Sequence, residues 1–418
     1  MAERVIFHVD VNSAFLSWTA VERLRGQGDS LDLRQVPAVI AGDAERRHGI
    51  VLAKSAPAKA RGVQTGEPLW QAEEKCPGLL VSRPDYALYV QQSRLLLRVL
   101  RETAPAVEQY SIDEAWADMS GTRWSRGDPA EAADRLRQRI KEELGFTVNI
   151  GVSSNKLLAK MAGDFQKPDR VHTLFPGEIE EKMWPLPVRD LFGIGPATER
   201  KLARFGIHTI GEIAVADPAF LRARFGKQGE YIWHASNGRC SEIVNPETAL
   251  NKGYGNSVTT DRDVCDRESA HRVLLSLCET AGMRMRRDGQ SAGVVAVHIR
   301  DGQFRDVSHQ RQLMAPSSVT RELWEAACRC FDELWNGRTP LRQLGVQFSR
   351  VSPDTARQRT LFDERDFERL ERLDRAVDSI REKYGEGALC RACFLHGDVA
   401  PMGGGLSKER RTGITKPV

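Results

Sequence analysis

Three acidic residues occupy places where a side chain could do chemistry. Asp10 ends a short apolar stretch, RVIFHVDV, and the pair Asp113 and Glu114 lies in a predicted turn between two β-like segments. Transfer of a phosphoryl group to a hydroxyl needs charge neutralisation on a triphosphate and a deprotonated attacking oxygen. Two Mg²⁺ ions held about 3.5–4 Å apart by a few carboxylates supply both. An acidic residue at a strand end is most often only solvated, so each of the three is weak evidence by itself.

The elements that must position these carboxylates alternate between strands and helices. Apolar spacing predicts strands at 4–11, 36–42, 49–55, twice within 106–119, and at 146–153. It predicts helices at 12–26, 86–104, 129–144 and 155–163, with 57–76 helical in parts. Alternation of this kind indicates an α/β or α+β catalytic body that reaches to about residue 170.

The chain from 185 to 240 is helical and basic, and it contains the phrase FGIGPATERKLARFG at 192–206. We interpret this phrase as a helix-hairpin-helix. Its turn, Gly193-Ile194-Gly195, lets backbone N–H groups approach a phosphate without obstruction by side chains. Such a contact binds duplex DNA without discriminating its sequence. The alternative is an ordinary turn between two helices.

The pattern changes again from residue 251. Four predicted strands and the helices 267–287 and 319–335 follow in the order β-α-β-β-α-β, the split βαβ arrangement. A polar linker, a helix at 364–384 and a basic end from 402 complete the chain. The arginines of the MRMRR run, 283–287, are predicted to be a solvated face, with DNA contact as the weaker alternative. His8 is predicted to be a packed residue rather than a ligand.

Composition restricts the class of protein more than it identifies one. Of the 418 residues 41% are apolar and 28% charged, which is ordinary for a soluble globular protein, and a net charge of +4 is too small to mark a nucleic-acid binder. No run of about 18 apolar residues occurs, and charges replace the apolar part of a signal peptide. We therefore expect a cytoplasmic protein with no membrane span and with reduced cysteines. Cys390 and Cys393 form a CxxC, but zinc is disfavoured because structural zinc sites take four ligands.

Four phrases form an ordered series along the chain: VDVNSAF, then YSIDEAWADMSG, then GVSSNKLLAKMAGDFQKP, then the Gly-Ile-Gly turn. The series closely resembles the Y-family translesion DNA polymerases, especially the bacterial DNA polymerase IV and polymerase V catalytic-subunit branches, from about residue 4 to about 395. The resemblance implies an α+β, multidomain, right-hand polymerase. It would have a ferredoxin-like palm, small fingers, a helical thumb with the helix-hairpin-helix, and a β-α-β-β-α-β little finger.

The implied domains cover the whole chain. They are the palm at 1–21 and 85–170, the fingers at 22–84, the thumb at 171–240, a linker at 241–250, the little finger at 251–352 and a C-terminal tail at 353–418.

The resemblance also implies roles for individual residues. Asp10, Asp113 and Glu114 become the catalytic metal carboxylates, and the backbone carbonyl of Val11 adds a ligand. Phe15 falls at the steric gate, an aromatic ring beneath the sugar that collides with a ribose 2′-OH; its alternative is a core aromatic. Implied nucleotide-binding positions are Asn12, Ser13, Ala14, Lys59 and Lys167.

The fingers depart from the usual family pattern. Many relatives have a tyrosine and an arginine that grip the triphosphate, where this chain has Ala56 and Lys59. Lys59 can pair with phosphate but lacks the bidentate fork of arginine. The departure indicates weaker nucleotide binding or a grip supplied by nearby Lys54 or Ser55.

A short peptide in the polar linker suggests a protein partner. Gln358, Leu361 and Phe362 match QxxLF, the peptide by which bacterial polymerases dock on the sliding clamp. Leu361 and Phe362 would fill an apolar pocket, while Gln358 hydrogen-bonds at its edge. The alternative is that the pair packs on the little finger as a small satellite core.

These observations predict a monomeric, low-fidelity DNA polymerase active in damage tolerance. It would add dNTPs to a primer–template with two Mg²⁺ ions, for which Mn²⁺ can substitute. The first alternative is an inactive polymerase-like scaffold that binds DNA and the clamp; inactive relatives of that kind have lost metal carboxylates, whereas this chain retains all three. The second alternative, a nucleotide cyclase, would need neither the hairpin nor the clamp-like peptide.

Overall fold

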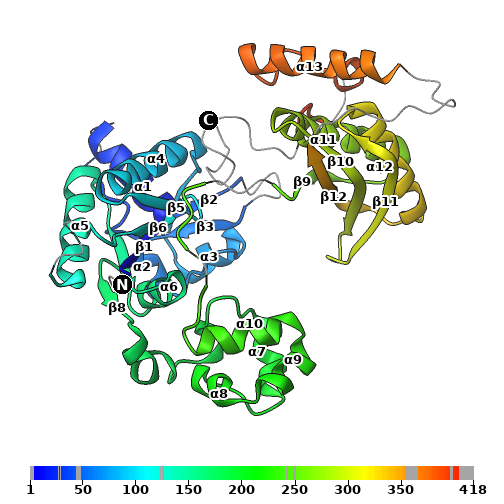
Figure 1. The fold of residues 1–418 in the computed structure, drawn as a ribbon. Coiled ribbons are helices and arrows are strands. Elements are labelled where there is room, and N and C mark those ends of the chain that lie inside the picture. Colours follow the sequence, from blue (N-terminus) through cyan, green and yellow to red (C-terminus); the bar gives the residue numbers. More distant parts are fainter. Residues whose placement is uncertain are drawn as a thin grey trace. The chain divides into compact units, whose positions relative to one another are not determined.

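The computed structural model describes residues 4–26, 28, 30–43, 49–122, 124, 127–241, 243–247, 251–353, 366–395 and 399–403 (Figure 1). The chain divides into two compact units, one formed mainly by residues up to 248 and the other mainly by residues from 249 onward. Each unit has its own large hydrophobic core. Within the described ranges no helix is long and apolar enough to cross a membrane.

A five-stranded sheet with the order β5-β6-β1-β7-β8 forms the centre of the first unit. β1 (Ile6–Val11) lies between β6 (Glu114–Asp118) and β7 (Val148–Ser153) and is antiparallel to both. At the edges, β5 (Ala106–Gln109) is antiparallel to β6, and β8 (Val171–Thr173) is parallel to β7. Asp10 and Glu114 are directly opposite each other in the β1–β6 ladder. Cross-strand partners lie on the same face of a sheet, so this register brings the two carboxylates together.

Alternate residues of β1 point to opposite faces of this sheet. Phe7 and Val9 belong to the main core, whereas Ile6 packs on the other face. His8 and Asp10 share that other face with Ile6, because they are two and four residues further along the strand. The strand is buried along its whole length, so both polar side chains must find partners inside the protein.

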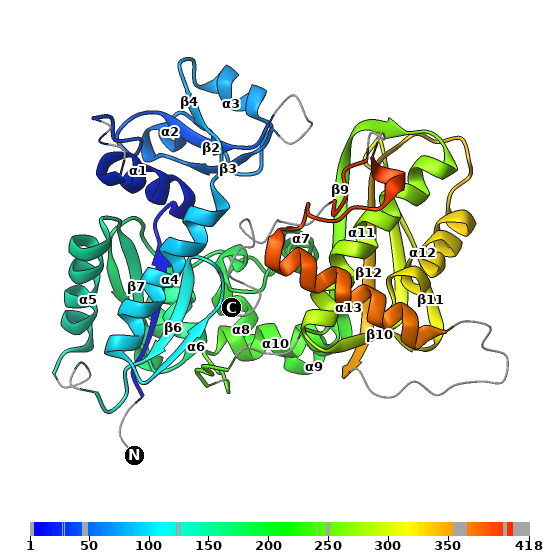
Figure 2. The ribbon, with the colours of Figure 1, turned by 90° about the horizontal axis from the view of Figure 1, so that it is seen from above.

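Helices cover both faces of the sheet (Figure 2). The main core receives side chains from α1 (Ala14–Gly26), α4 (Tyr86–Thr103) and α5 (Pro129–Leu144). The other face is covered by α6 (Lys156–Asp164), which contacts β1 and β7. The sequence fixes the ends of α5 locally, because Asp128 caps its first turn and Gly145 ends it in the left-handed conformation.

Close approach of α6 to β7 requires a glycine. A Cβ on Gly151 would lie 1.9 Å from the carbonyl oxygen of Ala159, so any larger residue would push the helix away. Asn155 fixes the start of the helix, since its side chain accepts a hydrogen bond from the Leu158 amide at 2.9 Å. The helix therefore packs closely against β7, and it also contacts β1 on the face to which Asp10 points.

A small three-stranded sheet with the order β3-β2-β4 follows α1 in the chain. Its strands are β3 (Val51–Lys54), β2 (Ala38–Ala41) and β4 (Leu80–Ser82). Two short helices, α2 (Ala56–Ala60) and α3 (Leu69–Lys75), share a core with it.

Short helical segments around one apolar core form the rest of the first unit. They are η2 (Pro176–Glu178), η3 (Ile179–Met183), η4 (Val188–Asp190), α7 (Pro196–Ala203), α8 (Ile210–Val215), α9 (Pro218–Phe225) and α10 (Lys227–Ser236). On the upstream side of the Gly193–Gly195 turn the helical segments are short. Pro185 and Pro187 lack the N–H donors that a continuous helix needs, so only η3 and η4 form there.

The second unit has the predicted element order β-α-β-β-α-β. Its elements are β9 (Gly253–Val264), α11 (Arg267–Arg287), β10 (Gln290–Asp301), β11 (Asp306–Ser317), α12 (Thr320–Leu334) and β12 (Leu341–Pro353). The sheet order is β11-β10-β12-β9, with antiparallel neighbours throughout. β12 therefore separates the two parallel strands β9 and β10, as in a split βαβ unit.

The C-terminal helix α13 (Phe367–Tyr384) packs on α11 and is followed by the short η5 (Ala392–Phe394). Arg286 of α11 donates to Asp378 at 2.6 Å, and its side chain is only 7% exposed. The prediction of a solvated arginine face was wrong for this residue. Its partner lies 92 positions away in the chain, so no local pattern could indicate the contact.

The remaining predicted helices and strands are confirmed to within a few residues. Predicted helices at 129–144 and 267–287 have the observed bounds of α5 and α11. Two strands were missed, β4 and β8, each of three residues. Strands this short show no periodicity of their own, and each is defined by a parallel neighbour from elsewhere in the chain.

Candidate active site

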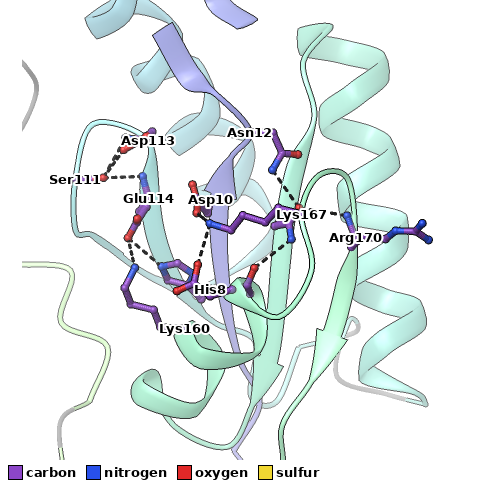
Figure 3. A network of polar contacts seen from close by, with 12 residues as sticks. His8, Asp10, Asn12, Ser111, Asp113, Glu114, Lys160, Lys167 and Arg170 are labelled. Carbon is purple, nitrogen blue, oxygen red and sulfur yellow. Dashed lines mark hydrogen bonds and ion pairs between the residues drawn. The ribbon is translucent and has the colours of Figure 1, made fainter. Parts of the chain in front are cut away.

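The three predicted carboxylates line one cavity of about 500 Å³ in the first unit. Figure 3 shows the three side chains and their polar contacts. Asp10 comes from the end of β1 and Glu114 from the start of β6, while Asp113 precedes Glu114 in the turn. A backbone hydrogen bond from the Val11 amide to the Asp113 carbonyl, 3.1 Å long, joins the turn to β1. Residues more than a hundred positions apart are thus brought together by one strand pair.

Asp10 is nearly buried and forms an ion pair with Lys167. Burial raises the pKa of Asp10 to about 6 and outweighs the opposite effect of the lysine. Burial alone would lower the pKa of Lys167, but its pairing with Asp10 and Asp164 raises it instead. The ammonium group of Lys167 thus compensates a carboxylate that water cannot reach freely.

Asp113 is fixed by the turn that carries it. The Ser111 hydroxyl donates to Asp113 at 2.6 Å and accepts from the Glu114 amide at 3.0 Å. Burial raises the pKa of Asp113, with the serine hydrogen bond acting in the opposite direction. Only its place in the YSIDEAWADMSG phrase could have pointed to Ser111.

Glu114 has two buried nitrogen partners. Lys160 Nζ lies 2.6 Å and His8 Nε2 3.3 Å from the same oxygen, Oε2. Burial would raise the pKa of Glu114, but hydrogen bonds from His8 and Lys160 lower it to about 2. His8 is packed, as predicted, and in addition it contacts a carboxylate of the site. Lys160 was missed by the sequence analysis, although it lies in the conspicuous SSNKLLAK phrase.

Asn12 connects the end of β1 to the loop that carries Lys167. Its side-chain amide donates to Asn149 at 3.0 Å, and its carbonyl oxygen accepts from the Asp169 amide at 2.9 Å. Asn149 also donates to the Gln166 carbonyl at 2.6 Å. In this structure Asn12 therefore orients the loop of Lys167, and a role in nucleotide binding stays a prediction.

One wall of the cavity comes from the small three-stranded sheet and α2. It includes Lys54, Ala56 and Lys59. Partial burial, together with the neighbouring Lys59, lowers the pKa of Lys54. Ser55 is fully engaged, because its hydroxyl donates to the Val36 carbonyl at 2.7 Å and accepts from the amides of Ala38 and Ala58. Of the two substitutes considered for the missing arginine, the geometry favours Lys54.

Phe15 lies in the cavity wall together with Ser13 and Ala14. Its ring stacks on Tyr89, with centroids 4.3 Å apart and an angle of 6° between the planes. Tyr89 is buried and its hydroxyl lies 3.1 Å from that of Thr19. Phe15 is thus a partly buried aromatic that lines the cavity and stacks on a buried partner.

The Gly193-Ile194-Gly195 turn lies in the helical part of the first unit, directly before α7. Gly193 has φ of +92°, and a Cβ there would lie 2.9 Å from the Tyr231 ring, so only glycine fits. Ile194 is buried in the local core and anchors the turn. The clamp-like peptide, Gln358 with Leu361 and Phe362, lies outside the described residues.

The donor set fits a hard divalent cation, because all three side chains present carboxylate oxygens. The geometry, however, is not that of a preformed metal site. No group of three His, Cys, Asp or Glu side chains within the described part of the chain converges closely enough to hold a metal ion. Instead, Asp10 pairs with Lys167, Asp113 accepts from Ser111, and Glu114 pairs with Lys160. A bound cation would replace the Lys167 contact as the neutralising charge of Asp10.

Three family models match successive parts of the chain. They are the impB/mucB/samB family at residues 9–164, the helix-hairpin-helix motif of the same family at 176–207, and the C-terminal domain of the family at 251–361. The last match ends at residue 361, within the predicted clamp-like peptide.

Relatives of high similarity cover almost the whole chain. The DNA polymerase IV of Clostridium acetobutylicum is 45% identical over 94% of this chain and 98% of its own. The DNA polymerase IV of Moorella thermoacetica is 39% identical over 89% of this chain and 93% of its own. A solved chimeric Y-family DNA polymerase has a similar fold, with a TM-score of 0.69 and 22% identity over 83% of this chain and 99% of its own.

Proposed function

The chain belongs to the impB/mucB/samB family of Y-family DNA polymerases, and we propose that it extends a primer by two-metal nucleotidyl transfer from a dNTP. As a member of this family it is a DNA-directed DNA polymerase and depends on a divalent metal ion. One observation carries the proposal: Asp10, Asp113 and Glu114 line a single cavity that is also lined by lysines. Carboxylates suit two metal ions and lysines suit a triphosphate, so one cavity offers both.

The carboxylates of Asp10, Asp113 and Glu114 and the backbone carbonyl of Val11 would hold the metal ions, with Mg²⁺ as the expected species. When bound, the ions neutralise charge on the triphosphate and favour ionisation of the attacking 3′-OH. Lys167 would then be released from Asp10 to pair with phosphate oxygens.

Lys54 of β3 and Lys59 of α2 would contact the triphosphate. Both side chains line the cavity, and both are compact point charges that suit phosphate without imposing the bidentate geometry of arginine. Two lysines would thus replace the tyrosine and arginine of the usual family pattern.

Phe15 would exclude ribonucleotides. Its ring cannot retreat, because it already stacks flat on the buried Tyr89. A 2′-hydroxyl placed against such a fixed ring meets a steric barrier, whereas a deoxyribose does not. Selection against ribonucleotides would thus come from the fixed position of the Phe15 ring against Tyr89.

The proposed role is translesion synthesis in DNA damage tolerance. The small side chains of Ser13, Ala14, Ala53 and Ala56 line the cavity. They would leave room beside a bound nucleotide. A roomy site accepts distorted base pairs at the expense of selectivity, because it offers little steric rejection. The Gly193–Gly195 turn would bind the duplex backbone, and the peptide from Gln358 to Phe362 would bind the sliding clamp.

Primer extension tests this proposal. Asp113→Ala or Glu114→Ala should reduce extension to below a few per cent of wild type on undamaged and damaged templates, while primer–template binding persists. Asp118→Asn, at the far end of β6, is the matched control and should extend normally. Substantial extension by either alanine variant would refute the assignment of the carboxylates.

A further inference from the structure

Glu114 differs from the other two carboxylates in how firmly it is fixed. Both of its hydrogen-bond partners, Lys160 and His8, contact the same oxygen, Oε2. Among the described residues Oε1 has no hydrogen-bond partner, and Glu114 lines the cavity. The protein thus fixes Oε2, while Oε1 stays available. Figure 3 shows Lys160 and His8 converging on Oε2.

Lys160 is itself held in one position. Its side chain is 8% exposed, and Nζ lies 5.3 Å from the ring centroids of both Tyr110 and Phe192. The two rings contact each other edge to face, with centroids 6.0 Å apart. An ammonium group between two aromatic faces is favoured electrostatically, so the rings confine it beside Glu114.

Phe192 joins this arrangement to the hairpin turn. It directly precedes Gly193, and its amide donates to the sulfur of Met161 on α6 at 3.4 Å. Its carbonyl accepts from the Tyr231 hydroxyl at 3.3 Å. The segment that carries the candidate DNA-binding turn is therefore one wall of the pocket that holds Lys160.

His8 completes the support from the strand side. The side chain is fully buried, its ring lies 5.4 Å from that of Trp116, and α6 backs it, since a Cβ on Gly163 would lie 3.3 Å from Nδ1. Its place is set by the two-residue period of β1, which puts it on the same face as Asp10. The imidazole therefore cannot leave Glu114 without disrupting the packing of α6.

Helix α6 carries a second buried lysine that serves as a comparison. Lys156, one turn before Lys160, pairs with Glu108 at 2.8 Å and 2.9 Å, and its side chain is 7% exposed. Glu108 does not line the cavity. The two lysines thus share helix, burial and pairing, and they differ in whether the partner belongs to the site.

We propose that Lys160, assisted by His8, is a positioning residue that orients Glu114 toward a divalent metal ion, and that Phe192 makes the hairpin segment part of this support. The proposal rests on the proposed function, in which Glu114 is a metal carboxylate. Fixing one oxygen removes rotamers that a long glutamate would otherwise sample, so less ordering remains when the metal binds.

A purely electrostatic role of Lys160 predicts the opposite change in metal affinity from a positioning role. Lys160 is a cation beside the metal site, so its removal should tighten cation binding if charge alone mattered. If positioning dominates, its removal should weaken metal binding. The sign of the change therefore separates the two effects.

Binding of Mn²⁺, followed by electron paramagnetic resonance, measures this change directly. The full chain is mixed with a primer–template ended by a dideoxynucleotide and with the next dNTP, so that no turnover occurs. Lys160→Met should raise the Kd for Mn²⁺ by about tenfold or more, the size typical of losing a partner that orients a metal ligand. Lys156→Met should lose similar stability in urea but keep the wild-type Kd.

Two further variants keep the outcome decisive. Tyr110→Leu removes one ring at a half-exposed position, so the chain should fold, and Kd should shift in the same direction as in Lys160→Met. Glu114→Ala reports on the proposed function, because it should lose Mn²⁺ binding whatever the role of Lys160. An unchanged or lower Kd in both Lys160→Met and Tyr110→Leu, with binding lost in Glu114→Ala, would overturn the positioning role alone. Unchanged binding in Glu114→Ala would overturn the proposed function itself.

Discussion

Removing the negative charge of Asp10 should make the metal-free protein more stable. Burial raises the pKa of this carboxyl from the usual 3.8 to about 6, so the folded state binds its proton more tightly than the unfolded state does. For an acid, this shift means that ionisation opposes folding. The penalty is absent below pH 3.8, develops between 3.8 and about 6, and is complete above that. A difference of about two pH units corresponds to about 3 kcal/mol of unfolding free energy.

Asp10→Asn preserves the shape of the side chain and removes the charge. Lys167 retains Asp164, 2.8 Å away, as a partner in the variant. At pH 8 in EDTA, the variant should unfold at a higher urea concentration than wild type, by up to about 3 kcal/mol in free energy. The advantage should shrink as the pH falls to 5. Adding Mg²⁺ should stabilise wild type and leave the variant unchanged, because a ligand stabilises only the state that binds it.

Asp32→Asn is a control for which the opposite change in the free energy of unfolding is expected. Burial would raise the pKa of Asp32, but hydrogen bonds from Arg34 lower it, so its charge stabilises the folded state above the unfolded pKa. That variant should lose stability at pH 8 and approach wild type as the pH falls. If Asp10→Asn were less stable than wild type at pH 8 in EDTA, the reasoning from burial would be refuted, and the Lys167 pair would have to be net stabilising.

Three further predictions concern substrate choice, DNA and the clamp. Phe15→Ala should allow ribonucleotide insertion at rates approaching those of deoxynucleotides, and an unchanged preference in single-nucleotide insertion would make Phe15 an ordinary packed residue. Gly193→Ala should weaken primer–template binding in a fluorescence anisotropy titration without abolishing Mn²⁺ binding, because the new Cβ would lie 2.9 Å from the Tyr231 ring and displace the turn; equal affinity would argue against a DNA contact there. Changing Leu361 and Phe362 to Ala should remove stimulation by the cognate clamp on long templates while short-primer synthesis persists. Loss of thermal stability with unaltered clamp binding in calorimetry would instead indicate that the pair packs on the second unit.

The sequence by itself determined most of the secondary structure, because that information is local. Each element is defined by residues close together in the sequence. In α5, for example, helical periodicity, the Asp128 cap and Gly145 give the predicted bounds. The acidic residues and their phrases also identified the family, which the relatives confirm. What the local patterns missed were β4 and β8, whose partners lie elsewhere in the chain.

Only the tertiary structure decided how the carboxylates are supported. Lys160 reaches Glu114 across 46 positions, and Asn12 reaches Asn149 across 137. The first contact depends on how closely α6 packs on the sheet, which the glycine at 151 permits. The second depends on the pairing of β7 with β1. Periodicity shows that a side chain is buried but not which distant group it meets, because the partner is chosen when the elements pack.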